Sequence, residues 1–121
     1  MSTYKALVIE DDLDLVTIFS KAMEAGGYEV EAITNGSAAL KRLEGDPPAL
    51  VVMDMHLPGV DGVALHHKIK SDERFKKTQL IIVTADAVLA DTLRDGFDLI
   101  LLKPISYVQL RDLAQRLLPR E

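Results

Sequence analysis

Four short, almost wholly apolar runs each end on a polar residue, and they constrain the fold more than any other feature of the sequence. Such runs are typical of strands in a parallel sheet that is covered by helices on both faces. The carboxyl ends of these strands meet at one edge of the sheet, where open α/β sheets form their sites. We therefore expect carboxylates, a hydroxyl and an ammonium group to converge there. The runs are residues 6–9 before Glu10, Asp11 and Asp12, residues 50–53 before Asp54, residues 80–83 before Thr84, and residues 99–102 before Lys103 and Pro104.

The segments between these runs carry helical periodicity. After the first run, apolar residues recur every three or four positions from Leu15 to Met23, with Asp12 or Asp14 as the amino-terminal cap and Gly26 and Gly27 at the carboxyl end. This alternation of strand and helix predicts right-handed crossovers and a doubly wound sheet of about five strands. The other predicted elements are a more exposed strand over residues 28–33, a turn at residues 35–36, and helices within residues 37–43, 61–70, 87–94 and 106–118.

Length and composition favour a single domain over residues 1–121. The chain has 121 residues with 48% hydrophobic content, which is enough to bury a core. Its net charge of −5 argues against direct binding to nucleic acid or to an anionic membrane. There is no cysteine, so disulfides and thiolate metal sites are excluded. The start lacks a signal-peptide pattern and no apolar run approaches a membrane span, so we expect a cytoplasmic protein.

The acidic residues at the first and second of these strand ends indicate a metal site. Glu10, Asp11, Asp12 and Asp54 would repel one another unless a cation lies among them. Magnesium favours one or two carboxylates together with water and phosphate oxygens, so the cluster suits Mg²⁺. The alternative is that Asp12 and Asp14 only cap a helix while Glu10 faces solvent.

Asp54 is the candidate nucleophile. An aspartate carboxylate can attack a phosphoryl group and hold it as an acyl phosphate. That transfer depends mainly on in-line positioning and charge neutralisation. The Lys103 ammonium would neutralise one phosphoryl oxygen, and the Thr84 hydroxyl would hydrogen-bond another. Taken singly, Lys103 reads equally as a surface residue and Thr84 as a strand-end cap, so the prediction depends on their joint placement.

The sequence resembles the receiver domains of two-component response regulators along its whole length. The matching pieces are residues 7–12, 35–40, 52–62, 84–85, Gly96 and 102–105. The resemblance implies the flavodoxin-like receiver fold of chemotaxis-type regulators, with strand order 2-1-3-4-5. It also implies that Asp54 accepts phosphate from a phosphohistidine of a histidine kinase or histidine phosphotransfer protein, which switches a protein-interaction surface. The chain would then be a regulatory phosphoacceptor and not an enzyme acting on other substrates.

The resemblance also implies a role for each site residue. Asp11, Asp54 and the main-chain carbonyl of Met55 would bind Mg²⁺, with Glu10 acting through water. The Thr84 hydroxyl would contact the phosphoryl group. The Lys103 ammonium would do the same, and the peptide bond that follows Lys103, to a proline, would be cis.

Three features depart from the usual receiver pattern. The family usually carries an aromatic residue three positions before the lysine, where this chain has Ile100, so we expect no aromatic swing. The stretch from Thr84 to Lys103 is shorter than in the family by about three residues, close to one helical turn, which predicts a shortened fourth helix. His56 follows Asp54 by two positions and Asp86 follows Thr84 by two, at positions that in the family flank the route of the attacking water. We interpret His56 as a gate because Mg²⁺ prefers oxygen ligands.

Two other classes of function remain open from the sequence. A haloacid-dehalogenase-type phosphatase resembles this chain in its strand-end aspartate, threonine and lysine, but it requires a second aspartate where His56 stands, and a cap domain. A pseudo-receiver would share the fold and serve only as a binding or dimerisation module. The intact set of Asp11, Asp54, Thr84 and Lys103 argues against the pseudo-receiver, whereas Ile100 and the short fourth helix are compatible with it. The sequence identifies neither the cognate kinase nor the downstream target.

Overall fold

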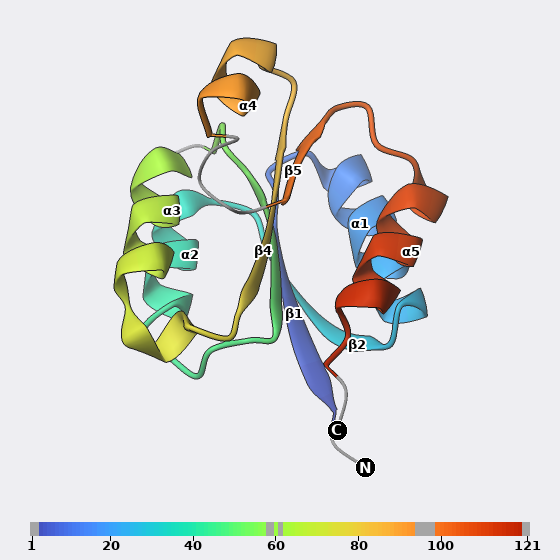
Figure 1. Cartoon of the computed structure of the whole chain (residues 1–121), viewed down its shortest axis with the longest axis horizontal. Coiled ribbons are helices and arrows are strands. Elements are labelled where there is room, and N and C mark those ends of the chain that lie inside the picture. The colour runs from blue at the N-terminus through green and yellow to red at the C-terminus, as the bar shows by residue number, and fades with distance from the viewer. Residues whose placement is uncertain (1–2, 58–59, 61, 94–98, 120–121) are drawn as a thin grey trace.

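The computed structural model describes residues 3–57, 60, 62–93 and 99–119 of the chain. Five strands form one parallel sheet in the order β2-β1-β3-β4-β5, as predicted. Helices α1 and α5 cover one face of the sheet, α2 and α3 cover the other, and α4 lies beyond the end of β4 (Figure 1). The strands are β1 (Tyr4–Ile9), β2 (Tyr28–Ile33), β3 (Leu50–Asp54), β4 (Gln79–Thr84) and β5 (Leu99–Leu102). The helices are α1 (Leu13–Ala25), α2 (Gly36–Arg42), α3 (Gly62–Ser71), the 3₁₀ turn η1 (Glu73–Phe75), α4 (Ala87–Leu93) and α5 (Tyr107–Leu117).

The sheet separates two hydrophobic cores. Successive side chains of β1 point to opposite faces, so Leu7 and Ile9 pack on the α2–α3 side and Ala6 and Val8 on the α1–α5 side. All four are 0% exposed, because helices cover both faces of the central strands. These continuous apolar runs are therefore required by burial on both sides.

Side chains at the helix starts fix where the site-bearing loops end. Asp12, one of the two predicted candidates, caps α1 by accepting hydrogen bonds from two main-chain amides of the first turn. Ser106 caps α5, as predicted, and accepts one such hydrogen bond. Asn35 caps α2 in the same way, although the sequence indicated only a turn there. Gly27 follows α1 with φ of 109°, a conformation that favours glycine.

The fourth helix is described over Ala87–Leu93, seven residues, which is the length of α2, and residues 94–98 after it lie outside the described part of the chain. A shortened fourth helix therefore stays a prediction. The boundary expected at Gly96 lies outside the described residues, and so do the expected Pro58–Gly59 loop and a helix start at Asp61. The Lys103–Pro104 peptide bond is cis, as expected.

A buried tyrosine ties the edge strand β2 to the last helix. The Tyr28 hydroxyl donates a hydrogen bond of 3.0 Å to the carbonyl oxygen of Ala114, and Tyr28 is 5% exposed. Burial raises the pKa of this hydroxyl from 10.0 to about 12. The neutral phenol is therefore the form that stabilises the fold.

Tyr28→Phe should lower the free energy of unfolding by about 1 kcal/mol at neutral pH, because the Ala114 carbonyl loses a buried donor. The wild-type hydroxyl contributes its stability fully below pH 10, where the unfolded tyrosine is still neutral, and loses it as pH rises toward 12. Urea denaturation at neutral pH and between pH 10 and 12 checks both effects. The phenylalanine variant should lose less stability across the alkaline range, and identical alkaline losses in the two proteins would contradict this role of Tyr28.

Candidate functional site

The register of the sheet places four strand ends side by side. In the β1–β3 ladder Glu10 falls level with Asp54, one residue beyond the last pair. In the β3–β4 ladder Asp54 lies opposite Val83, one residue before Thr84. On the far side of β4, the main-chain N–H of Lys103 donates to the Thr84 carbonyl oxygen at 2.7 Å. Residues from separate parts of the chain thus meet at the carboxyl edge of the sheet.

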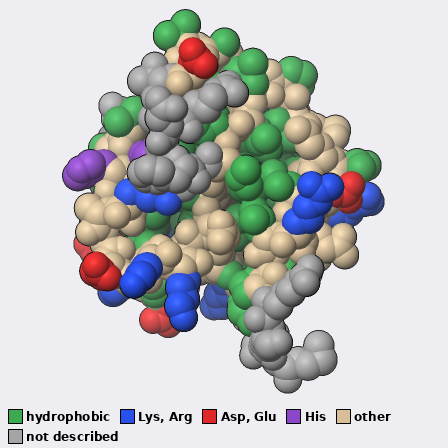
Figure 2. All heavy atoms as spheres, in the orientation of Figure 1, with side chains coloured by type: hydrophobic (Ala, Val, Ile, Leu, Met, Phe, Trp, Pro, Cys, Tyr) green, Lys and Arg blue, Asp and Glu red, His purple; other side chains and the backbone are tan. Residues whose placement is uncertain are grey.

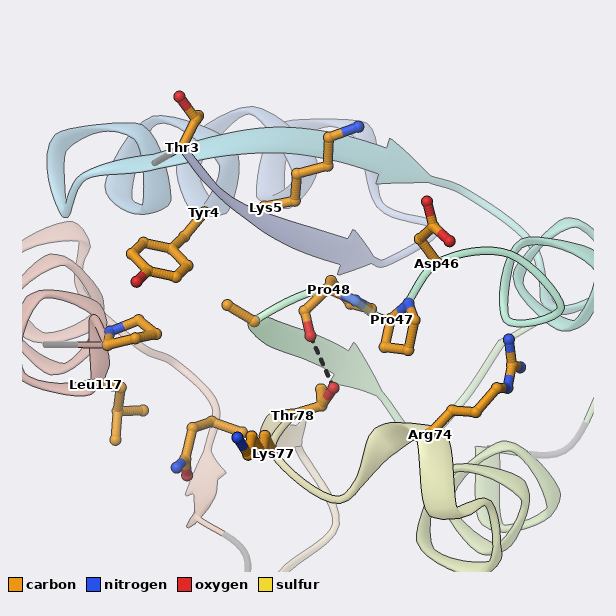
Figure 3. A pocket seen from close by; sticks show the side chains of 13 residues that line it. Thr3, Tyr4, Lys5, Asp46, Pro47, Pro48, Arg74, Lys77, Thr78 and Leu117 are labelled. Carbon is orange, nitrogen blue, oxygen red and sulfur yellow. Dashed lines mark hydrogen bonds between the residues drawn. The ribbon is translucent and has the colours of Figure 1, made fainter. Parts of the chain in front are cut away.

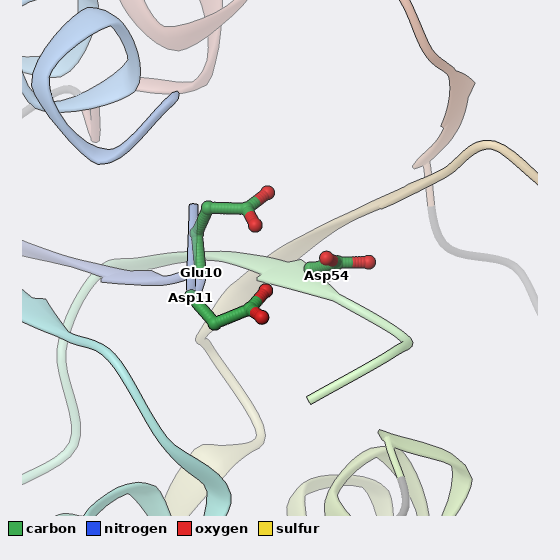
Figure 4. Close-up of side chains that lie close together, drawn as sticks. All are labelled: Glu10, Asp11 and Asp54. Carbon is green, nitrogen blue, oxygen red and sulfur yellow. The ribbon is translucent and has the colours of Figure 1, made fainter. Parts of the chain in front are cut away.

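Three carboxylates gather at this edge. Glu10, Asp11 and Asp54 each offer an oxygen, and these atoms lie within 4.8 Å of one another. Their side chains extend to the same side of the strand ends (Figure 4). Glu10 is 1% exposed and Asp54 is 5% exposed, whereas Asp11 is exposed to solvent. The predicted convergence of these carboxylates is confirmed, but the Asp12 side chain caps α1.

Lys103 joins two of the three carboxylates. Its Nζ donates to Glu10 Oε1 at 2.9 Å and to Asp54 Oδ2 at 3.2 Å. The other oxygen of Asp54, Oδ1, accepts a hydrogen bond of 3.1 Å from the main-chain N–H of His56. Both oxygens of Asp54 are therefore held, one by a cation from β5 and one by the loop that follows β3. The sequence predicted neither the ion pair with Glu10 nor the His56 hydrogen bond.

Burial and neighbouring charges shift the pKa of two of these groups in the same direction. Burial raises the pKa of Glu10, and the charge of Asp54 adds to this, although hydrogen bonds from Lys103 and from the Asp12 amide oppose it. For Lys103, burial acts to lower the pKa, but the hydrogen bond and charge of Glu10 and the charge of Asp54 outweigh burial and raise it. The ammonium therefore stays charged. One cation faces three carboxylates, which leaves an excess of negative charge that a divalent cation can neutralise.

The Thr84 hydroxyl is connected to the start of α4. Thr84 is 0% exposed, and its Oγ1 accepts a hydrogen bond of 3.0 Å from the main-chain N–H of Asp86. The Asp86 carboxylate in turn accepts from the main-chain amides of Val88 and Leu89, each at 3.0 Å, in the first turn of α4. A movement of the hydroxyl would thus disturb the contact that orients this helix. Sequence reasoning missed Asp86 as a cap of α4, although an aspartate just before a helix is the usual signal.

The loop after β3 carries two residues with predicted roles. The Met55 N–H donates to the Val83 carbonyl at 3.3 Å, and the Met55 main-chain carbonyl packs against Gly62. The His56 side chain is exposed beside the site. A metal-ligand role for the Met55 carbonyl and a gate role for the His56 side chain stay predictions.

A pocket of about 680 Å³ lies at the opposite edge of the sheet (Figure 3). Lys5 and Gln79 line it from the amino-terminal halves of β1 and β4. Thr78 donates to the Pro48 carbonyl at 2.7 Å within it. The pocket therefore stands at the other end of the strands that carry the acidic cluster, and it shares no residue with that cluster.

Comparison with known proteins agrees with this geometry. The family model of the response regulator receiver domain matches residues 6–115. The polar-differentiation response regulator DivK of Brucella abortus (strain 2308) is 33% identical over 107 residues, which cover 86% of this chain and 87% of that protein. The phosphate regulon transcriptional regulatory protein PhoB of Rhizobium meliloti (strain 1021) is 30% identical over 119 residues. That match covers 96% of this chain but 52% of PhoB, so the chain spans about half the length of this relative.

One solved structure shares the fold and itself contains a metal ion. The receiver domain of the sensor histidine kinase PA1611 from Pseudomonas aeruginosa PAO1 superposes with a TM-score of 0.81 and 26% identity. The match covers 95% of this chain and 97% of that one, and that structure has a magnesium ion coordinated in its active site cleft.

Among the helices that the structure describes, none has the length and apolar composition needed to span a membrane.

Lys103→Gln should lower the free energy of unfolding by about 3 kcal/mol without added divalent cation, because it leaves Glu10 and Asp54 buried without their cation. This is the lower end of the range for a broken buried pair, since the Lys103 side chain keeps 20% exposure. Lys76→Gln, at an exposed lysine, serves as the control and should change stability by less than about 0.5 kcal/mol. Urea denaturation of both variants checks this. Equal stability of Lys103→Gln and wild type would show that the ammonium does not stabilise the acidic pair.

Proposed function

Because the chain belongs to the response regulator receiver family of two-component systems, we propose that Asp54 is its phosphoacceptor. The phosphoryl group would come from a phosphohistidine of a histidine kinase or histidine phosphotransfer protein. The observation that carries this assignment is the setting of Asp54, which lies buried beside two carboxylates with Lys103 on one of its oxygens. Because the chain belongs to this family, we set aside the alternative of a haloacid-dehalogenase-type phosphatase.

The transfer itself asks little acid–base chemistry of the protein. An oxygen of Asp54 attacks phosphorus in line, the bond from phosphorus to the histidine nitrogen breaks, and the electron pair stays on the imidazole. Lys103 moves its ammonium from Glu10 and Asp54 to a phosphoryl oxygen, where it neutralises developing charge. The chain is thus a regulatory domain that assists its own phosphorylation and dephosphorylation.

The acidic cluster fits a magnesium ion. Its donors are carboxylate oxygens, which Mg²⁺ prefers, and their negative charge exceeds the single positive charge of Lys103. Asp11 and Asp54 would hold the ion directly and Glu10 through water, with the Met55 carbonyl as the predicted main-chain ligand. When bound, Mg²⁺ supplies positive charge to the phosphoryl oxygens during transfer.

Phosphorylation would be read out through the Thr84 hydroxyl. To reach a phosphoryl oxygen, the hydroxyl gives up the hydrogen bond from the Asp86 amide, which loosens the start of α4. This is a shift between two populations, biased by the new contact. Ile100 on β5 is partly buried against the core on the α2–α3 side. Because it is an isoleucine, it has no aromatic ring that could swing between surface and core.

Exposed apolar residues on α4, β5 and α5 would offer contacts to a partner protein. Val88 is 77% exposed, Leu102 is 49% exposed and Val108 is 50% exposed. Figure 2 shows apolar side chains gathered on the side of the molecule where β5 and α5 lie. We infer that this surface binds a downstream protein and neither nucleic acid nor a membrane, and that residues 1–121 act as one receiver domain in the cytoplasm. Activities of a longer protein, such as those of PhoB, are not assigned to this chain.

Asp54→Asn should abolish the phosphoryl mass that the wild-type chain gains from acetyl phosphate and Mg²⁺, because an amide oxygen is a poor nucleophile. Asp46→Asn, at an exposed loop aspartate, should leave the labelling unchanged. Intact mass spectrometry measures both, and circular dichroism verifies that each variant is folded. Full labelling of Asp54→Asn would refute the assignment, and a wild-type chain that takes no label would favour the pseudo-receiver.

Asp11→Ala should weaken Mg²⁺ binding by at least about tenfold. Even the loss of a residue that only hydrogen-bonds to a metal ligand typically lowers metal affinity by that factor. Without Mg²⁺ the variant should be as stable as wild type or more stable, because one of three crowded negative charges is gone. Asp14→Ala, an exposed aspartate in the first turn of α1, is the control. Calorimetric titration with Mg²⁺ and thermal unfolding with and without the ion check the two effects. Unchanged Mg²⁺ affinity in Asp11→Ala would exclude Asp11 as a ligand.

A further inference from the structure

Two glycines lie unusually close to the loop that carries the His56 amide. A Cβ atom added at Gly36, the first residue of α2, would come within 2.5 Å of Val60 Cβ and 2.8 Å of Val60 N. A Cβ added at Gly62, the first residue of α3, would come within 2.6 Å of Met55 Cα and 2.7 Å of the Met55 carbonyl carbon. Non-bonded atoms do not approach so closely, so with any larger residue at either position one of the two contacting segments must shift.

Residues on both sides of these contacts are held by partners of their own. Met55, the first residue after β3, donates its main-chain N–H to the Val83 carbonyl at 3.3 Å. On the other side, α2 is fixed by the Asn35 cap, whose Oδ1 accepts from a first-turn amide at 2.8 Å, and by Ala39, which is 0% exposed. A Cβ at Gly36 would therefore displace Val60 more readily than it would displace α2.

The loop in turn sets the orientation of the Asp54 carboxylate. The His56 N–H holds Oδ1 at 3.1 Å, while Lys103 holds Oδ2 at 3.2 Å. With one oxygen on each restraint, a shift of the His56 amide rotates the carboxylate about its last bond. In-line attack tolerates little misalignment, and a displacement of about 1 Å can cost up to about 100-fold in rate.

We propose that Gly36 and Gly62 are positioning residues for Asp54: their missing side chains let Val60 and Met55 pack closely enough against α2 and α3 for the His56 amide to orient the carboxylate. This inference rests on the proposed phosphoacceptor function and deepens it. Gly36 acts from α2, eighteen positions before Asp54 in the sequence, and it touches neither the metal site nor the phosphoryl group.

Gly36→Ala tests the proposal, with Gly45→Ala as the matched control. A Cβ at Gly45 meets atoms of Arg42 at 3.4 Å, which is ordinary contact. Gly36→Ala should slow phosphorylation by acetyl phosphate about tenfold or more, weaken Mg²⁺ binding severalfold and shift the amide resonance of His56 in NMR spectra. Gly45→Ala should match wild type in all three. Adding Val60→Gly to Gly36→Ala removes the closest clashing atom and should recover part of the lost rate.

The outcomes separate this proposal from the function on which it rests. A Gly36→Ala protein that melts earlier but is labelled at the wild-type rate, with an unshifted His56 resonance, would show a merely structural glycine and overturn the proposal. A wild-type chain that takes no phosphoryl group would instead overturn the proposed function. If Gly36→Ala does not fold, Val60→Gly alone loosens the same contact and should slow labelling severalfold. A wild-type labelling rate in Val60→Gly would then refute the positioning role.

Discussion

The Lys103 ammonium, shared between Glu10 and Asp54, is the interaction on which the rest of the site depends. Two carboxylates that are almost fully removed from water cannot both stay ionised at close range without a cation. Lys103 supplies that charge from the strand end beyond β4, at 2.9 and 3.2 Å from the two carboxylate oxygens. The sheet order β1-β3-β4-β5 makes this reach possible, because β4 is the single strand that separates β3 from β5. This ion pairing also explains how two acidic side chains can be buried at the carboxyl edge of the sheet.

The sequence predicted much of this fold because burial on both faces leaves a strong local signal. Continuous apolar runs such as those ending at Asp54 and Thr84 indicate central strands, and the alternation with helices determines that they are parallel. The caps at Asp12 and Ser106 were predictable for the same reason, since a polar residue before a helical pattern is a local feature. Features of this local kind were the ones within reach of the sequence, although the caps at Asn35 and Asp86 were missed.

Contacts between distant parts of the chain were not accessible in this way. The pairing of Lys103 with Glu10 spans 93 positions. No local sequence pattern distinguishes a lysine that forms this ion pair from one that contacts only a phosphoryl oxygen. The close approach of Gly36 to Val60 depends on where α2 crosses the loop, which only packing determines. Asp86 carried a local signal, but its link to the Thr84 hydroxyl required knowledge that this hydroxyl is fully buried.

The restraints around Asp54 differ in how easily they can be released, and this difference decides on which side of Asp54 the structure would change after phosphorylation. On the β3 side, the His56 amide directly follows Met55, whose backbone packs closely against Gly62. On the β4–β5 side, the Lys103 ammonium can exchange a carboxylate oxygen for a phosphoryl oxygen, and the Thr84 hydroxyl, which accepts from the Asp86 amide, can donate its own hydrogen to one. A new anion at Asp54 would therefore leave the β3 side in place and exchange partners on the β4–β5 side. The consequence reaches α4 and the exposed apolar residues near β5, because these elements follow directly from the strand ends whose contacts change.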